Sequence, residues 1–297
     1  MKTLLQFCQM AELDNDVTNE IILLDKKLSS NLGEQIIDIA NTIIDNDTDK
    51  LLHDSLVEKA EKLGAEIQIN KYKMQMILMV YCLIRLEDKY QQAGINKQIY
   101  QITASDIKSR IIECQEVFHT IGMSCARWYF CFMNLSLQRL DEEGLEFEVK
   151  PSNFDYDKKQ VQIKKGEPVI SIHIPNNYKI SIEQVIKDLK TSYKYYNFNG
   201  RAIYKCQSWL LYKPFEEVFV KGGRIQEFRE LFDIIDNIDA PEFEDCFRVF
   251  KCEKIENLDS LPTQTRLQQN MKKHLEKGGK TGEGLGVLVF DGDKIIE

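Results

Sequence analysis

Reactive side chains follow two short apolar strands predicted in the second half of the chain. The first strand covers residues 169–174 and carries His173 near its end. The second covers residues 202–206 and leads into Cys206 and Ser208. Proteins that combine helices with a sheet often place binding and catalytic groups where buried strands end. The sequence therefore predicts a functional site at these two strand ends.

Each of the three side chains has a chemical and a structural interpretation. His173 can serve as a general base, because imidazole titrates near neutral pH, or it can be hydrogen-bonded at the sheet edge. Cys206 can be a nucleophile if a histidine or a helix N-terminus lowers its pKa, but a buried thiol is the favoured interpretation. Ser208 fits capping or orientation better than attack, since no Gly-x-Ser-x-Gly sequence surrounds it.

A helix between the two strands is needed to bring their ends together. The sequence Ser181-Ile-Glu-Gln184 matches a capping box, and apolar residues recur behind it at helical spacing. A strand, a capped helix and a second strand form a βαβ unit, whose strands are parallel and whose connection is right-handed. Because parallel strands end at the same sheet edge, we expect His173 and Cys206 to lie near each other there.

The chain changes character near residue 141, which predicts two domains, 1–140 and 141–297. The first reads as helical, with a buried helix over 74–86 and one long helix or two in series over 105–140. The second mixes helices with strands, so the fold class is α+β. Its other predicted elements are strands at 145–149, 161–164, 246–250 and 286–290 and a helix at 263–277.

The glycine-rich segment 278–286 contains Gly279-Lys280-Thr281, which matches the tail of a nucleotide-binding P-loop. However, the first glycine of that motif falls on His274, and the segment follows a helix instead of a strand. We therefore interpret this segment as a helix C-cap followed by a mobile loop.

Composition narrows the function classes. The 297 residues carry a formal net charge of −8, which argues against a nucleic-acid partner. Eight cysteines without a Cys-x-x-Cys pair indicate reduced thiols and a cytoplasmic protein. The longest apolar run is too short to span a membrane, and no export signal is visible. The four histidines show no metal-ligand spacing, so no metal site is predicted.

The C-terminal half, from about residue 161, resembles a bacterial family of acyltransferase-domain proteins. Members of that family have a helical N-acyltransferase-type N-terminal domain and a GNAT-like C-terminal domain. The residues that carry the resemblance lie in matching order along the chain: Ile172-His-Ile-Pro175, Cys206-x-Ser-Trp-Leu-Leu211, Ile225 with Phe228 and Phe232, Leu261-Pro-Thr-x-Thr-x-Leu-Gln268, His274-Leu275, Gly278-Gly279 and Gly282-x-Gly-x-Gly286.

The resemblance implies a mixed GNAT-like sheet flanked by helices and an acyl-CoA co-substrate. In the common GNAT pattern a glycine-containing loop after the first parallel strand holds the coenzyme A pyrophosphate. Here that loop reads Pro175-Asn-Asn-Tyr-Lys-Ile-Ser181, without glycine. The amides at the start of the following helix can still bind phosphate. The predicted coenzyme A contacts are therefore Asn176, Asn177, Tyr178, Lys179 and Ser181.

These observations predict an N-acyltransferase that moves an acyl group from acyl-CoA to a small amine acceptor. His173 is expected to accept the amine proton, and Ser208 or a tyrosine to protonate the leaving thiolate. One alternative is a degenerate GNAT fold that binds a ligand or partner without catalysis, which the glycine-free loop favours. Another is a thiol enzyme that uses Cys206 with His173.

Overall fold

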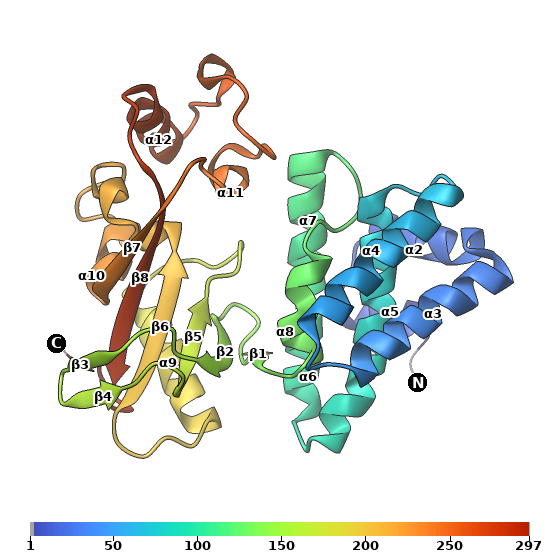
Figure 1. The fold of residues 1–297 in the computed structure, drawn as a ribbon, viewed down its shortest axis with the longest axis horizontal. Helices are drawn as coiled ribbons and strands as arrows, with labels where there is room; N and C mark the ends of the chain where they lie inside the picture. Colours follow the sequence, from blue (N-terminus) through green and yellow to red (C-terminus); the bar gives the residue numbers. More distant parts are fainter. Residues whose placement is uncertain (1–2, 297) are drawn as a thin grey trace. The chain divides into compact units, whose positions relative to one another are not determined.

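The computed structural model describes residues 3–296, and the chain divides into two compact units (Figure 1). The first unit comprises Met1–Arg139 and the second Leu140–Glu297. Each unit has its own hydrophobic core, and each is described separately below.

The first unit is helical, as predicted, and its centre is α5 (Lys71–Gln92). Every residue of α5 from Met74 to Ile84 is buried, so the predicted buried helix is confirmed. A helix without a polar stripe needs partners on all sides, and α1 to α4 and α6 pack around it. The elements of this unit are α1 (Leu4–Met10), α2 (Asn15–Lys27), α3 (Ser29–Asp45), α4 (Lys50–Glu66), α5, α6 (Lys97–Ala104), α7 (Asp106–Phe118), η1 (Ala126–Tyr129), α8 (Phe130–Met133) and β1 (Leu137–Arg139).

The prediction of one long helix or two in series over 105–140 is wrong beyond Phe118. Helix α7 ends there, because His119 adopts the left-handed conformation with a φ of 53°. The chain then turns so that Gly122 lies against Tyr72, where an added Cβ would come within 2.9 Å of the Tyr72 carbonyl carbon. The Met123 amide donates to the Tyr72 carbonyl oxygen at 3.0 Å. This long-range contact with the start of α5 outweighs the local helical pattern.

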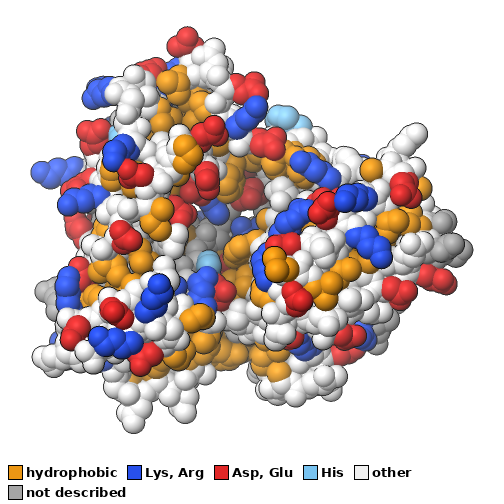
Figure 2. Space-filling view, in the orientation of Figure 1, with side chains coloured by type: hydrophobic (Ala, Val, Ile, Leu, Met, Phe, Trp, Pro, Cys, Tyr) orange, Lys and Arg blue, Asp and Glu red, His pale blue; other side chains and the backbone are white. Residues whose placement is uncertain are grey.

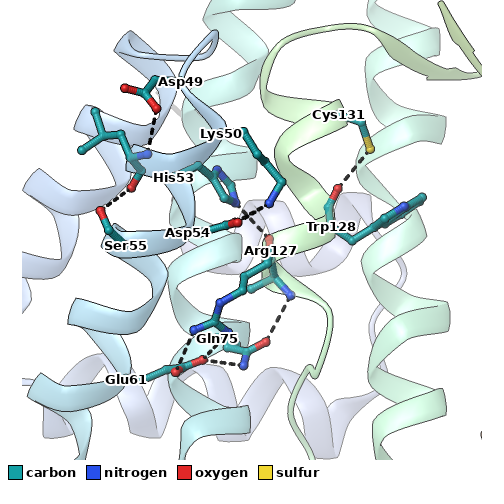
Figure 3. A network of polar contacts seen from close by, with 12 residues as sticks. Asp49, Lys50, His53, Asp54, Ser55, Glu61, Gln75, Arg127, Trp128 and Cys131 are labelled. Carbon is teal, nitrogen blue, oxygen red and sulfur yellow. Dashed lines mark hydrogen bonds and ion pairs between the residues drawn. The ribbon is translucent and has the colours of Figure 1, made fainter. Parts of the chain in front are cut away.

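A polar network joins α4, α5 and η1 (Figure 3). Gln75 donates to Glu61 at 2.7 Å and accepts from the Ala126 amide at 3.1 Å. Arg127 forms a two-pronged ion pair with Glu61, with distances of 3.1 and 3.2 Å. The ring of His53 is buried and bonds the Ala126 carbonyl oxygen through Nε2 at 3.1 Å. Burial lowers the pKa of His53 and so favours its neutral ring.

A second network buries a carboxylate at the start of α7. Asp106 is fully buried and accepts from Arg110 Nε and from the Tyr129 hydroxyl, both at 2.9 Å. Arg139 Nη1 lies 3.7 Å from its other oxygen. Burial alone would raise the pKa of Asp106, but the two guanidinium groups outweigh it and lower the pKa.

The second unit contains a mixed sheet whose strands run in the order β2, β5, β6, β8, β7. Strands β5 and β6 are parallel, and the other pairs are antiparallel. The hairpin β3–β4 and its apolar side chains pack against one face of the sheet, and α9 packs against the other. The elements are β2 (Glu146–Pro151), β3 (Tyr156–Lys158), β4 (Val161–Ile163), β5 (Pro168–His173), α9 (Ile182–Tyr195), β6 (Ala202–Ser208), η2 (Trp209–Leu211), η3 (Lys213–Glu217), α10 (Arg224–Glu230), β7 (Asp233–Ala240), α11 (Cys246–Phe250), η4 (Leu258–Ser260), α12 (Arg266–Glu276) and β8 (Thr281–Phe290).

The predicted βαβ unit is confirmed by the parallel pairing of β5 with β6 on either side of α9. Ser181 caps α9, and its hydroxyl accepts from the Gln184 amide at 3.2 Å. The reciprocal half of the capping box does not form. The Gln184 side chain donates instead to the buried Asp188 at 2.8 Å. That carboxylate also accepts from the Leu145 amide at 3.1 Å and so ties α9 to the start of β2.

Two further predictions need correction, and one strand was not predicted. Residues 246–250 form helix α11, not a strand, because the buried Cys246, Val249 and Phe250 follow helical spacing. The edge strand β7 was not predicted, since it is polar and mostly exposed. The glycine-rich segment becomes strand β8 from Thr281 onward instead of a mobile loop.

Glycines in β8 allow η2 to pack on the strand. A Cβ added at Gly284 would lie 2.2 Å from the Leu211 carbonyl oxygen, which no side chain tolerates. Thr265 caps the N-terminus of α12. Gly278 follows its C-terminus with a φ of 71°, which confirms the predicted helix-ending role of this glycine. The glycines of this segment thus serve packing at the end of β6.

We predict that Asp106→Asn destabilises the first unit by about 3–5 kcal/mol, because two buried guanidinium groups lose their counter-charge. Since the folded-state pKa of Asp106 is lowered, its contribution is present at neutral pH and declines as the pH falls below the ordinary carboxylate range. Urea unfolding followed by Trp128 fluorescence in a Trp209→Phe background measures the effect.

The matched control is Asp54→Asn, which removes a partly exposed ion pair with Lys50 and should cost less than about 1 kcal/mol. Equal losses in the two variants would contradict the role assigned to Asp106.

Candidate functional site

The site is built around the place where β5 and β6 part. The two parallel strands share the pairs Ile170–Tyr204 and Ser171–Lys205. Beyond those pairs β5 continues to His173 and β6 to Ser208, while each strand keeps its antiparallel neighbour, β2 or β8. Backbone groups that two adjacent strands do not use for each other can bind an extended ligand.

Alternation along the strands sorts the site residues onto two faces of the sheet. Ile172 and Cys206 lie in the apolar cluster under α9, together with Phe147. His173 and Lys205 are each one residue away along their strands, so they point to the opposite face. The structure therefore does not bring Cys206 to His173, although both residues stand near the same strand ends.

His173 forms a hydrogen-bonded pair with a glutamate on the neighbouring strand. Its Nε2 lies 2.7 Å from Glu148 Oε2, and the two side chains are 23% and 13% exposed. Burial would raise the pKa of Glu148, but the hydrogen bonds from His173 and Lys150 outweigh it and lower the pKa to about 2. Glu148 is thus a carboxylate at every physiological pH. A carboxylate can only accept, so His173 donates Nε2–H to it, and in the neutral tautomer of the ring the lone pair lies on Nδ1.

Two lysines accompany this pair on the same face. Lys150 Nζ donates to the same Glu148 Oε2 at 2.5 Å. Lys205 is buried, and its ammonium donates to Asn153 Oδ1 at 3.2 Å. Burial and the nearby charge of Lys150 lower the pKa of Lys205, while Glu148 opposes that shift. The face therefore carries Glu148 together with two lysines and an imidazole, and Glu146, which opposes His173 in the register, lies on it as well.

The remaining two candidates have structural partners. Cys206 is 1% exposed, and burial raises the pKa of its thiol to about 12. Ser208 is half-buried, and its hydroxyl accepts from the Leu210 amide at 3.2 Å, which caps η2. The capping interpretation of Ser208 therefore has a direct counterpart in the structure.

The segment after β5 holds the predicted coenzyme A contacts. Asn177 and Lys179 are exposed, and Asn176 and Ser181 are half-buried. Tyr178 is buried in the cluster under α9, and its amide donates to the Pro175 carbonyl oxygen at 3.0 Å. The ring of Tyr178 thus packs in the core instead of facing a ligand. Glu183 lies in the first turn of α9 and places negative charge at the helix N-terminus.

Sequence reasoning missed Glu148, Lys150 and Lys205. The alternating segment Glu146-Phe-Glu-Val-Lys150 shows that Glu148 and Lys150 share a polar face. It does not show that this face lies beside His173. That requires the antiparallel register of β2 with β5, in which Glu146 opposes His173 and Glu148 opposes Ser171.

Comparison with known proteins assigns the chain to a family. The family model described as the GNAT-like C-terminal domain matches residues 139–288. The chain belongs to this family. The resemblance and the α+β fold with a GNAT-like sheet are thereby confirmed. None of the curated protein sequences matches this GNAT-like chain.

Solved structures share the fold over nearly the whole chain. A crystal structure of an acyltransferase mutant in complex with octanoyl-CoA has a TM-score of 0.74 and 14% identity, covering 94% of this chain and 85% of its own. An acyltransferase in complex with decanoyl-CoA and teicoplanin has a TM-score of 0.73 and 16% identity, covering 98% and 86%. A third, in complex with CoA and 10C-Teicoplanin, has a TM-score of 0.72 and 16% identity, covering 94% and 85%.

Further features of the described residues bear on the predicted partners. No helix within residues 3–296 has the length and apolar content to cross a membrane. Among the same residues, no group of three histidine, cysteine or acidic side chains is placed to hold a metal ion. Basic and acidic side chains intermingle on the face shown in Figure 2.

We predict that Cys206 resists alkylation in the native protein. A thiol with a pKa of about 12 has a thiolate fraction more than about a thousandfold smaller than that of an ordinary cysteine with a pKa near 8.5. Treatment with iodoacetamide at pH 7.5, followed by peptide mass spectrometry, should leave Cys206 unmodified and label it in urea. The half-buried Cys252 is the internal comparison. Selective labelling of native Cys206 with loss of activity would instead support the thiol-enzyme alternative.

Proposed function

We propose that the protein is an acyltransferase that moves an acyl group from acyl-CoA to the amine of a small acceptor. The observation that carries this proposal is the His173–Glu148 pair beside the point where the parallel strands part, within a GNAT-like domain. The splayed strands offer backbone groups to an extended thioester, and the pair offers a base to the attacking amine. Structures with the same fold are described as acyltransferases with octanoyl-CoA or decanoyl-CoA, which supports a medium-chain donor here.

The reaction follows from the chemistry of these groups. The amine nitrogen attacks the thioester carbonyl carbon and forms the new C–N bond. His173 Nδ1 accepts a proton from the amine, directly or through a water molecule. The C–S bond then breaks, and the coenzyme A thiolate takes up a proton. Ser208, at the end of β6, or a tyrosine is our candidate to pass that proton from solvent to the thiolate, so that its hydroxyl is protonated again at the end of the step. Backbone amides near the splay would stabilise the oxyanion.

Glu148 orients the imidazole and supports its charged form. A carboxylate that accepts from Nε2–H fixes the tautomer in which Nδ1 carries the lone pair. When the ring takes a proton, the same carboxylate stabilises the imidazolium. Since the pKa of Glu148 is about 2, it does not titrate in the pH range of the reaction.

Coenzyme A would lie along the segment between β5 and α9. The start of α9 offers backbone amides and the positive end of a helix dipole to the pyrophosphate. Asn176, Asn177, Lys179 and Ser181 would contact the coenzyme, with Lys179 supplying a positive charge. Tyr178 is left out, because its ring is buried. Glu183 weakens phosphate binding here, since it adds a negative charge to the same helix turn.

A second candidate is a GNAT-like domain that binds a ligand or partner without catalysis. The absence of glycine between Pro175 and Ser181 favours it, because a side chain on each residue limits how closely a pyrophosphate can approach the backbone. This candidate predicts that acyl-CoA does not bind.

We predict that His173→Ala lowers kcat by about 10²–10⁴-fold, because the reaction loses its base, while the Kd for acyl-CoA stays within about twofold. Glu148→Gln should lower kcat less, since it keeps an acceptor for Nε2–H but loses the charge.

Release of free CoA from decanoyl-CoA with a panel of primary amines measures both variants. Lys190→Met, on the opposite side of the sheet, is the control. Full activity in His173→Ala would rule out the base assignment.

We predict that the protein binds decanoyl-CoA with micromolar affinity in isothermal titration and that Glu183→Gln tightens binding by about two- to fivefold, as expected for a charge in the first turn of a helix. Lys179→Ala should weaken it. Glu227→Gln, in the first turn of α10, is the matched control and should leave the Kd unchanged. If the protein binds neither acetyl-CoA nor decanoyl-CoA, the transferase proposal is contradicted, and a GNAT-like domain without catalytic activity is favoured.

A further inference from the structure

Lys150 stands beside the proposed catalytic pair without belonging to it. It lies on β2, two residues from Glu148, so both side chains project from the same face of the sheet. Its Nζ lies 2.5 Å from Glu148 Oε2, and His173 Nε2 lies 2.7 Å from that same oxygen. A single carboxylate oxygen is thus shared between an ammonium group and an imidazole.

Sharing this oxygen has an electrostatic consequence. A carboxylate next to a histidine favours the imidazolium form, which cannot accept a proton. A permanent positive charge on the same oxygen opposes that effect in two ways. It takes up part of the carboxylate's charge, and it repels a second positive charge on the ring.

We propose that Lys150 is a positioning residue that keeps His173 in its neutral, proton-accepting form while Glu148 fixes the tautomer of the ring. The consequence for catalysis rests on the proposed acyltransferase function, whereas the effect on the protonation of His173 does not. A His–carboxylate pair alone orients the ring but also charges it. Lys150 opposes the charging of the ring but leaves its orientation by Glu148 in place.

Other titratable groups near His173 also influence its protonation. From β2, Glu146 opposes His173 in the register and is fully buried. From β6, the buried Lys205 lies on the same face, with its ammonium on Asn153. After β5, Lys179 is exposed. Lys150 differs from all three because it contacts the oxygen that His173 contacts.

The test is the titration of His173 followed by NMR of the imidazole Cε1 proton. The chain has four histidines, and the signal that disappears in His173→Gln assigns this one. In Lys150→Met the midpoint should rise by about one pH unit, as expected when a like charge within about 4–6 Å is removed. Lys150→Arg keeps the positive charge and should restore the wild-type midpoint. Lys190→Met removes an exposed lysine on α9 and should not change it.

An unchanged or lower midpoint in Lys150→Met would overturn the proposal, and so would a shift of equal size in Lys190→Met. If Lys150→Met is unstable, Lys150→Arg still tests the proposal. A folded Lys150→Arg variant whose His173 midpoint differs from that of the wild type would also overturn the proposal. In the enzyme assay, the acidic limb of the kcat/KM profile should move to higher pH in Lys150→Met. A shifted NMR midpoint without a shifted rate profile would count against His173 as the base and leave the role of Lys150 intact.

Discussion

The parallel pairing of β5 with β6 is short, and the rest of the second unit depends on where it stops. Two residue pairs hold the strands together, and then β5 stays with β2 while β6 stays with β8. A sheet that loses pairing at its centre leaves polar backbone groups there, and such groups require a partner. An extended acyl-pantetheine chain would suit such a break, so the break adds to the support that the His173–Glu148 pair gives to the proposed transferase.

Helix α9 and the short helix η2 pack next to the strands that part at this break. Helix α9 connects the two strands and is fixed by its Ser181 cap and by the buried Asp188, which accepts from the Leu145 amide. On the other side, Gly284 allows η2 to lie directly on β8. Beyond the shared pairs, the end of β5 pairs with β2 and the end of β6 with β8.

The two faces of the sheet differ in the side chains they carry. The face under α9 buries Ile172 and Cys206 in an apolar cluster, where a thiol is inert. The opposite face collects Glu148, Lys150, His173 and Lys205, where Glu148 accepts from both His173 and Lys150. The first unit shows the same principle in its core, where Asp106 balances Arg110 and Arg139. In both units the partners of a carboxylate lower its pKa, although Asp106 is fully buried and Glu148 only partly so.

Local patterns in the chain were enough to predict the helical first part, the buried helix around Met74–Leu86 and the βαβ unit, and they made His173 a candidate site residue. These features depend on periodicity, capping residues and turn residues, which act over a few positions. The end of α7 at Phe118, helix α11, strand β7 and the extension of β8 depended on contacts between distant segments, such as that of Gly122 with Tyr72. The partners of His173 belong to the second group as well. Glu148 and Lys150 are 25 and 23 positions away in the chain, and only the register of β2 against β5 brings Glu148 to the ring and Lys150 to the same Glu148 oxygen. Register is set by how two strands pack together, because a shift of one residue would turn every side chain to the other face.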